Sequence, residues 1–517
     1  MSTKTRLGAV SAGHAETVTA AHAMLAAGGN AFDAALAAYL AACVAEPILA
    51  SLGGGGFLLA HRSGERTLLY DFFVHSPRHP REEGVDFYPV DVDFGATTQE
   101  FHIGMGSIAT PGGVRGLFRV HKDLCSLPLL EIAQPALALA RNGVRVNALQ
   151  SYLQGILEPI LVATDEARTL FSAANAPDRL AREGDQFRMP DFANFLETLI
   201  EEGDVLFYSG DVAKAIAEAN AERGGHLDMS DLENYEVIVR EPLRLRHRGA
   251  DLSMNPPPSS GGVLIAFALA LLEQAGDIDA FGSIEHVRRL IETMYLTDRA
   301  RHDSGLDQSD EAPDRLLSDA FLNEYLRLRT EHPLFPRGTT HISVADDAGN
   351  LASLSLSNGE GSAFVAPGTG VMLNNMLGEE DLNPAGLQKF PPDRRMASMM
   401  CPTLMTREDG TAVALGSGGS NRLRTAILQV LVDTLYFDMN LEASVNSPRL
   451  HFERDVLNVE PGFPPATTDW FRDSFPDAVF WDAFNLFFGG VHAVAVHPDG
   501  TFSAGADARR GGVARTT

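Results

Sequence analysis

Cysteine is scarce in this chain, with only Cys43, Cys125 and Cys401 in 517 residues. The three are scattered and odd in number, so the sequence predicts neither a disulfide framework nor the ligand spacing of a metal site. Free cysteines of this kind are typical of a reducing compartment. We therefore expect a cytoplasmic protein.

Long apolar runs and excess basic charge are also missing. No stretch of about 18 apolar residues occurs, so no membrane-spanning helix is predicted. The first residues, MSTKTRLGAVSAGHAE, carry no apolar segment after their basic residues, and we expect no secretory signal. The net charge of −27 argues against nucleic acid or an anionic membrane as a partner, because both require a basic face.

The composition, 45% hydrophobic and 21% charged, is that of a globular protein with a large core. Residues 14–47 predict two helices joined by AGGN at 27–30, and residues 57–61 and 67–73 predict a strand pair. The stretch 115–330 is mainly helical in pattern, whereas β patterns dominate after residue 339. Helices flanking two β-layers favour a four-layer α/β sandwich over a doubly wound fold.

The segment that starts at Thr339 carries the clearest chemical signal. Alternating residues at 341–345 and 351–357 flank the turn cluster DDAGN, which predicts a hairpin. A turn centred near residue 348 places Thr339 opposite Ser357. If the chain is cut before Thr339, this residue has both a hydroxyl nucleophile and an α-amine able to act as a base near neutral pH. The same residues also fit an ordinary strand pair.

Two glycine-rich segments allow close backbone approach. Gly418 and Gly419 precede a predicted helix at 421–436, where free backbone amides can bind an oxyanion or simply form a tight turn. Gly53–Gly56 lacks the lysine of a phosphate loop, and its strand and helix context is reversed. The sequence therefore excludes nucleotide binding at that segment.

Eight blocks in order resemble the gamma-glutamyltranspeptidases, which are N-terminal nucleophile hydrolases. They are AGGNAFDAALAA, LGGGGF, SIATPGGVRGLF, NPPPSSGG, TTHISVADDAGN, GTGVMLNN, LGSGGSNR and SPRLHFE. The resemblance covers nearly the whole chain. It implies a four-layer αββα sandwich, and a proenzyme that cleaves itself between Gly338 and Thr339.

The resemblance also implies roles for individual residues. Cleavage would give a large subunit, 1–338, and a small subunit, 339–517, that remain associated in one intertwined core. Thr339 matches the nucleophile, Ser357 its supporting hydroxyl residue, and Gly418 and Gly419 the oxyanion hole. Asn358 and Glu379 are the matches for substrate-binding residues, with Glu380 and Asp381 as rivals to Glu379. The substrate would be a small amide, as in glutathione metabolism, with no metal or organic cofactor, and a homodimer is left open.

The sequence departs from the family at two positions that bind the α-carboxylate of a glutamyl substrate. Phe73 stands where the family has an arginine, and Ala397-Ser398 replaces a serine pair, so only Ser398 remains. Arg78, Arg394 and Arg395 are candidate replacements for the lost charge. The departures favour a relative that acts on another small amide, in the manner of oxamate amidohydrolase or the cephalosporin acylases. An unprocessed binding protein is the alternative from another class.

Overall fold

The structure is a computed structural model of the chain. It describes residues 7–93, 98–304, 312–318, 321, 339–383, 386–419, 422–453 and 456–517. The candidate linker at 331–338, which includes Gly338, lies outside the described residues. In the part of the chain that is described, no helix is both long and apolar enough to cross a membrane.

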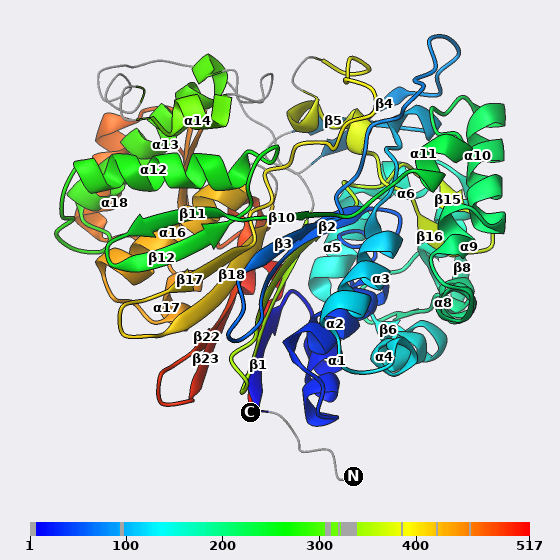
Figure 1. Cartoon of the computed structure of the whole chain (residues 1–517). Helices are drawn as coiled ribbons and strands as arrows, with labels where there is room; N and C mark the ends of the chain where they lie inside the picture. The colour runs from blue at the N-terminus through cyan, green and yellow to red at the C-terminus, as the bar shows by residue number, and fades with distance from the viewer. Residues whose placement is uncertain are drawn as a thin grey trace.

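Two antiparallel sheets form the centre of the molecule (Figure 1). The first sheet has the strand order β10 (Ile238–Arg240), β3 (Leu68–Asp71), β2 (Gly55–His61), β14 (Leu351–Ser357), β13 (Thr340–Asp346), β1 (Gly8–Ala12) and β24 (Val513–Thr516). The second has the order β11 (Leu243–His247), β12 (Ala250–Met254), β17 (Thr403–Thr406), β18 (Ala412–Gly418), β22 (Gly490–Val496) and β23 (Phe502–Ala506).

Helices cover the outer face of each sheet. Beside the first sheet, at the right of Figure 1, lie α1 (Ala15–Ala26), α2 (Ala31–Ala45), α3 (Gly113–Leu124), α4 (Leu129–Asn142), α5 (Ala148–Ile156), α6 (Glu158–Leu161), α7 (Asp165–Leu170), α8 (Pro190–Glu202), α9 (Val205–Tyr208), α10 (Asp211–Arg223) and α11 (Met229–Glu233). Beside the second lie α12 (Gly261–Gln274), α13 (Ile284–Ser304), α14 (Ala312–Leu316), α16 (Arg422–Tyr436), α17 (Leu441–Val445) and α18 (Pro465–Ser474). This is the four-layer αββα sandwich that the sequence predicts.

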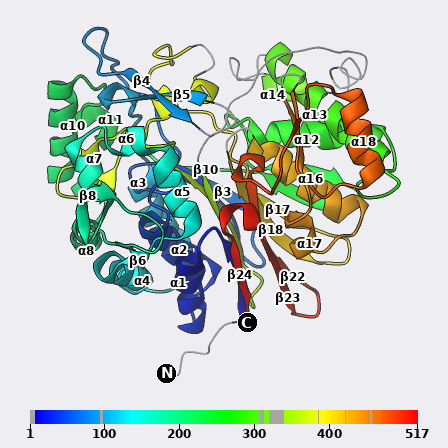
Figure 2. The same ribbon diagram turned by 180° about the vertical axis from the view of Figure 1, so that it is seen from behind.

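Smaller elements decorate this core. They are the strand pairs β4 (Tyr88–Asp93) with β5 (Thr98–Ile103), β6 (Val144–Arg145) with β9 (Gln186–Phe187), β7 (Ser172–Ala173) with β8 (Ala176–Leu180), and β15 (Val365–Ala366) with β16 (Val371–Met372), and the three-stranded sheet of β19 (Leu450–Glu453), β20 (Val456–Val459) and β21 (Val479–Phe480). Short 3-10 helices are η1 (Met105–Ser107), η2 (Met376–Gly378), η3 (Glu380–Leu382), η4 (Leu486–Phe488) and η5 (Ala508–Arg510). Seen from behind, β24 runs beside the central strands to the C-terminus (Figure 2).

The two-residue period of β13 decides what each of its faces contacts. Ile342 and Val344 belong to the core cluster formed with α1 and α2. His341 and Ser343 point the other way, toward the second sheet, where the Ser343 hydroxyl donates to the carbonyl of His492 at 3.0 Å. Because Thr339 shares its parity with His341, its side chain belongs on the face toward the second sheet.

Most long elements match the sequence predictions, but several short strands do not. The two helices at 14–47, the strand pair at 57–73 and the helix at 421–436 are confirmed as α1 and α2, β2 and β3, and α16. The interpretation of 115–330 as mainly helical is incomplete, since β10, β11 and β12 lie in it. These strands are three to five residues long, and their pairing partners are supplied by other parts of the chain as well as by the local hairpin.

Candidate active site

The hairpin of β13 and β14 has the register that the sequence predicts. Thr340 pairs with Leu356 and Ala345 pairs with Leu351, so extending the register by one residue sets Thr339 opposite Ser357. The turn is held by Asp346, whose Oδ1 accepts hydrogen bonds from the backbone amides of Ala348 at 2.9 Å and Asn350 at 3.1 Å. Thr339 and Ser357 are both buried, and Ser357 Oγ accepts a hydrogen bond from the Gly359 amide at 3.1 Å.

The turn after β18 packs directly on Thr339. A Cβ atom on Gly418 would lie 2.1 Å from the Thr339 carbonyl oxygen, so only glycine allows this approach. Gly419 follows with a φ of 120°, which side chains rarely adopt, and its carbonyl accepts from the Arg422 amide at the start of α16. Gly418, one of the two glycines that the sequence predicts for the oxyanion hole, thus lies directly against the predicted nucleophile residue. Ser420 and Asn421 lie outside the described residues.

Two buried charged residues beside Thr339 were missed by the sequence analysis. Arg510 Nη1 donates to the Thr339 carbonyl at 2.9 Å, and Glu46 Oε2 accepts from the Thr340 hydroxyl at 3.0 Å. Burial lowers the pKa of Arg510 to about 10 and raises the pKa of Glu46, although hydrogen bonds from Thr17 and Thr340 oppose the second shift. A carboxylate at the end of the apolar run AACVAE was the available signal for Glu46.

His341 is a positioning residue rather than an acid or base in this geometry. Its Nδ1 lies 2.8 Å from Ser355 Oγ and its Nε2 lies 3.0 Å from Ser343 Oγ. Burial, together with the neighbouring His492, sets its pKa well below the ordinary value, so the ring is neutral at neutral pH. A Cβ atom on Gly416 would lie 2.3 Å from His341 Cε1, so the ring packs against β18 two residues before Gly418.

The loop after β14 brings the predicted substrate-binding residues together. Asn358 is fully buried, and its amide oxygen and nitrogen have no hydrogen-bond partner among the described residues. A Cβ atom on the next residue, Gly359, would lie 2.5 Å from Glu379 Oε1. Asn375 Oδ1 shapes the loop by accepting from the Glu360 and Gly361 amides at 3.0 and 3.2 Å. Asn358 and Glu379 therefore lie in one cluster that follows the end of the nucleophile hairpin.

Comparison with known proteins finds a family match over most of the chain. The family model described as "Gamma-glutamyltranspeptidase" matches residues 17–517. The chain belongs to this family. Acylase ACY 1 proenzyme from Pseudomonas sp. (strain V22) is 30% identical, over 96% of this chain and 91% of that protein. Glutathione hydrolase proenzyme from Escherichia coli (strain K12) is 29% identical, over 93% of this chain and 87% of that protein.

Solved structures support the same fold. A cephalosporin acylase from Bacillus halodurans superposes with a TM-score of 0.85 at 24% identity, and the match covers 99% of this chain and 96% of that one. The Helicobacter pylori gamma-glutamyltranspeptidase structure matches 60% of this chain and 88% of its own, with a TM-score of 0.53 at 25% identity. The family match and the two proenzyme relatives support an enzyme of the gamma-glutamyltranspeptidase and acylase hydrolase group.

Phe73, which the sequence resemblance matches to the family's arginine, is a core residue. Phe73 is 1% exposed, and its ring stacks on Phe57 with 5.3 Å between centroids. Its backbone is fixed as well, because its amide donates to Asp71 Oδ1 at 3.1 Å and its carbonyl accepts from the Tyr235 hydroxyl at 2.6 Å. Ser398 is also buried, and its hydroxyl accepts a hydrogen bond from the Met400 amide at 3.1 Å.

Two of the candidate replacement arginines are engaged elsewhere. Arg395 Nε lies 3.4 Å from Asp71 Oδ1, and its guanidinium lies 4.7 Å from the centre of the Tyr235 ring. Arg78 Nη1 pairs with Asp393 Oδ2 at 2.9 Å. Both guanidinium groups are thus paired with carboxylates of the protein itself.

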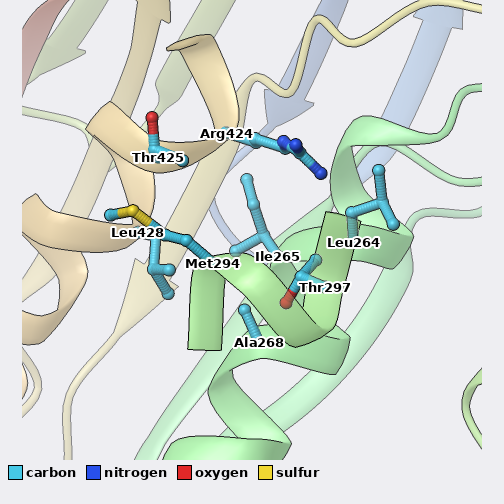
Figure 3. Close-up of a pocket in the computed structure, with 8 residues that line it drawn as sticks. All are labelled: Leu264, Ile265, Ala268, Met294, Thr297, Arg424, Thr425 and Leu428. Carbon is cyan, nitrogen blue, oxygen red and sulfur yellow. The ribbon is translucent and has the colours of Figure 1, made fainter. Parts of the chain in front are cut away.

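A small cavity between α12, α13 and α16 is too small to be a substrate site. Its volume is about 10 Å³, which suits about one water molecule rather than a ligand. Arg424 reaches beside it from α16 (Figure 3). Its Nη2 lies 3.1 Å from both Asp298 Oδ1 and Glu453 Oε1. The cavity is lined by Leu264, Ile265, Ala268, Met294, Thr297, Arg424, Thr425 and Leu428.

Proposed function

We propose that the chain is an autoprocessed amide hydrolase or acyltransferase whose nucleophile is Thr339. The observation that carries the proposal is the position of Thr339, opposite Ser357 and in contact with Gly418. Cleavage of the Gly338–Thr339 bond would give the subunits 1–338 and 339–517 and free the Thr339 α-amine. The names of the two relatives, both called proenzymes, support this step.

The proposed reaction follows from these groups. Thr339 Oγ attacks the substrate carbonyl carbon while its proton passes to the Thr339 α-amine. The oxyanion is stabilised by the backbone at Gly418 and Gly419. The amine returns the proton to the leaving nitrogen as the C–N bond breaks, which leaves an acyl ester on Thr339. Water or an acceptor amine, deprotonated by the same α-amine, then releases the acyl group.

The preferred acyl group, we propose, lacks the α-carboxylate of a glutamyl residue. Phe73 is buried in the core where the family has its arginine, and Ala397 removes one of two hydroxyls. Glu379 remains as a carboxylate that can bind an amino group. Since two charged hydrogen bonds are worth about 1.5–3 kcal/mol each, their loss removes on the order of two to four decades of kcat/KM.

Four p-nitroanilides test this preference as a matched set. The γ-glutamyl anilide has both polar groups, the 4-aminobutyryl anilide lacks the carboxylate, the glutaryl anilide lacks the amine, and the butyryl anilide lacks both. We expect the 4-aminobutyryl anilide to have a kcat/KM at least equal to that of the γ-glutamyl anilide, because the α-carboxylate gains no charged partner. Glu379→Gln should reduce turnover of both amine-bearing substrates. A γ-glutamyl advantage above about 100-fold over 4-aminobutyryl would show that another cation binds the carboxylate.

Glutathione hydrolysis is the second candidate, because the Escherichia coli relative with that name is almost as similar as the acylase. It would require a residue that binds the α-carboxylate of the γ-glutamyl group. The same four substrates therefore separate the two candidates without further experiments.

A further inference from the structure

A buried arginine contacts both halves of the proposed catalytic site. Arg510 is 5% exposed and lies in η5, close to the C-terminus. Its Nη1 donates to the Thr339 carbonyl at 2.9 Å. A Cβ atom on Gly418 would lie 3.1 Å from Nη1, and a Cβ atom on Gly419 would lie 3.1 Å from Nη2. The guanidinium therefore lies against both the nucleophile residue and the turn that forms the oxyanion site.

A buried carboxylate holds the next residue from the opposite face of the sheet. Glu46 is 1% exposed at the end of α2, and it accepts hydrogen bonds from Thr17 Oγ1 at 2.9 Å and Thr340 Oγ1 at 3.0 Å. Glu46 and Arg510 attract each other across the start of β13. Thr339, just before β13, and Thr340, its first residue, are thus held between one cation and one anion, both removed from water.

We infer that Arg510 is a positioning residue that fixes the Thr339 carbonyl and keeps the Thr339 α-amine in its neutral, proton-accepting form. The inference rests on the proposed function, because only a cleaved chain has this amine. The carbonyl oxygen and the α-nitrogen of one residue lie within about 4 Å of each other by covalent geometry. The guanidinium is therefore close enough for its positive charge to disfavour protonation of the amine.

Other groups around the start of β13 do not supply this positive charge. Burial lowers the pKa of His14, at the end of β1, to about 4, and that of His492, on β22, to about 4, so both rings are neutral at neutral pH. His341 on β13 is neutral for the same reason. Glu46 acts in the opposite direction, since a negative charge favours the protonated amine. Asp507, next to η5, pairs with Arg449 and Arg509 at 2.7 and 3.1 Å and also attracts Arg510.

The sign of the expected pH effect follows from these charges. Arg510→Gln removes the positive charge, so the α-amine pKa rises and the acidic limb of the kcat/KM profile moves up by about one pH unit. Arg510→Lys keeps the charge and should stay close to wild type. Glu46→Gln removes the opposing negative charge and should move the limb to lower pH. A residue with only a packing role would change the height of the profile but not the position of its limb.

The measurement is the pH profile of kcat/KM for each variant, on whichever anilide of the matched set the wild type hydrolyses fastest. Intact mass first shows whether each variant has a chain that begins at Thr339. If Arg510→Gln remains uncleaved, 1–338 and a chain of Met followed by 339–517 are coexpressed, because removal of Met supplies the Thr339 amine without self-cleavage. Wild-type halves produced in the same way are the control.

The outcomes for Arg510 and for the proposed function are distinguishable. The inference is supported if the acidic limb of the kcat/KM profile moves to higher pH in Arg510→Gln and stays near the wild-type pH in Arg510→Lys. The inference is overturned if the acidic limb lies at the same pH in Arg510→Gln and wild type, or if it moves by the same amount in Arg510→Gln and Arg510→Lys. A wild-type chain that hydrolyses the anilide but is never cut before Thr339 refutes the proposed function itself.

Discussion

At the scale of single residues, the arrangement around Thr339 depends on side-chain parity and on one close backbone contact. Thr339 and Ser357 sit opposite each other at the open end of a hairpin, on the face that looks toward the second sheet. Gly418 approaches the Thr339 carbonyl at a distance that no Cβ atom would allow. The proposed nucleophile, the hydroxyl residue opposite it and the proposed oxyanion turn are therefore brought together by the ends of three strands, β13, β14 and β18.

Ser357 is expected to support Thr339 rather than to attack the substrate. Ser357→Ala should slow both self-cleavage and turnover by about 10- to 1000-fold, the scale of a lost hydrogen bond beside a reacting group. Ser11→Ala is the matched control, because Ser11 is a buried serine of the same sheet whose hydroxyl donates to the Gly505 carbonyl at 2.7 Å.

The control should lower stability by about 1 kcal/mol without changing turnover per folded molecule. Cleavage is followed on denaturing gels over time, and turnover by release of p-nitroaniline. Covalent labelling of Ser357 by an electrophilic glutamine analogue, with Thr339 unlabelled, would reverse the assignment of the two residues.

At the scale of elements, β13 and β14 of the first sheet make close polar contacts with β18 of the second sheet, near the proposed site. His341 on β13 sits against Gly416 on β18, and the Ser353 hydroxyl donates to the Leu415 carbonyl at 2.8 Å. These contacts fix how β13 and β18 lie against each other. Since Gly418 ends β18, a shift between the two strands would also change the contact between Gly418 and Thr339.

Gly416→Ala should therefore disturb both stability and activity. The new Cβ atom would lie 2.3 Å from His341 Cε1, and overpacking of this kind costs about 1–3 kcal/mol. We expect a lower Tm and a turnover reduced along with it. Gly155→Ala in α5 is the control, because its Cβ atom would meet no atom within 4 Å and should leave Tm equal or slightly higher.

Thermal unfolding of the two variants and the wild type gives the comparison. An unchanged Tm for Gly416→Ala would show that the sheets separate easily and that the His341 contact does not fix β18.

The sequence predicts those elements whose signals are local. The helix pair at 14–47 is marked by its own turn, and the hairpin register follows from the DDAGN cluster between its two strands. The short strands β1 and β24 have little pattern of their own, and β1 finds its partner β13 more than 300 residues away, with Gly8 opposite Asp346. Such strands are specified by the assembled sheet.

The candidate site divides in the same way. Thr339, Gly418 and Gly419 belong to blocks that are recognisable in the sequence, and Ser357 follows from the hairpin register, which the structure has as well. Arg510 lies 171 positions from Thr339 in the sequence, and Glu46 lies 294 positions from Thr340. No local sequence pattern therefore reveals these two contacts. Phe73 shows the reverse case: the sequence marks its departure from the family, and the structure adds that its ring lies in the core.

At the scale of the whole molecule, both sheets contain strands from both sides of the Gly338–Thr339 bond. In the first sheet, β14 pairs with β2, and both β13 and β24 pair with β1. In the second sheet, β17 pairs with β12. A cut before Thr339 would therefore leave two chains that share two sheets and their cores. We expect the chains to stay associated in native buffer and to separate only on unfolding, because neither could cover its apolar sheet faces alone.

Intact mass under denaturing conditions shows whether the chain is cut before Thr339. Wild-type protein should give two chains of about 36 and 19 kDa, in proportion to their lengths in a total of 55.6 kDa, with the smaller chain beginning at Thr339. Thr339→Ala should give one chain of full mass, and Thr339→Ser, which keeps a hydroxyl, should still give two. A wild-type protein that remains one chain of 55.6 kDa and yet hydrolyses amides would contradict the account.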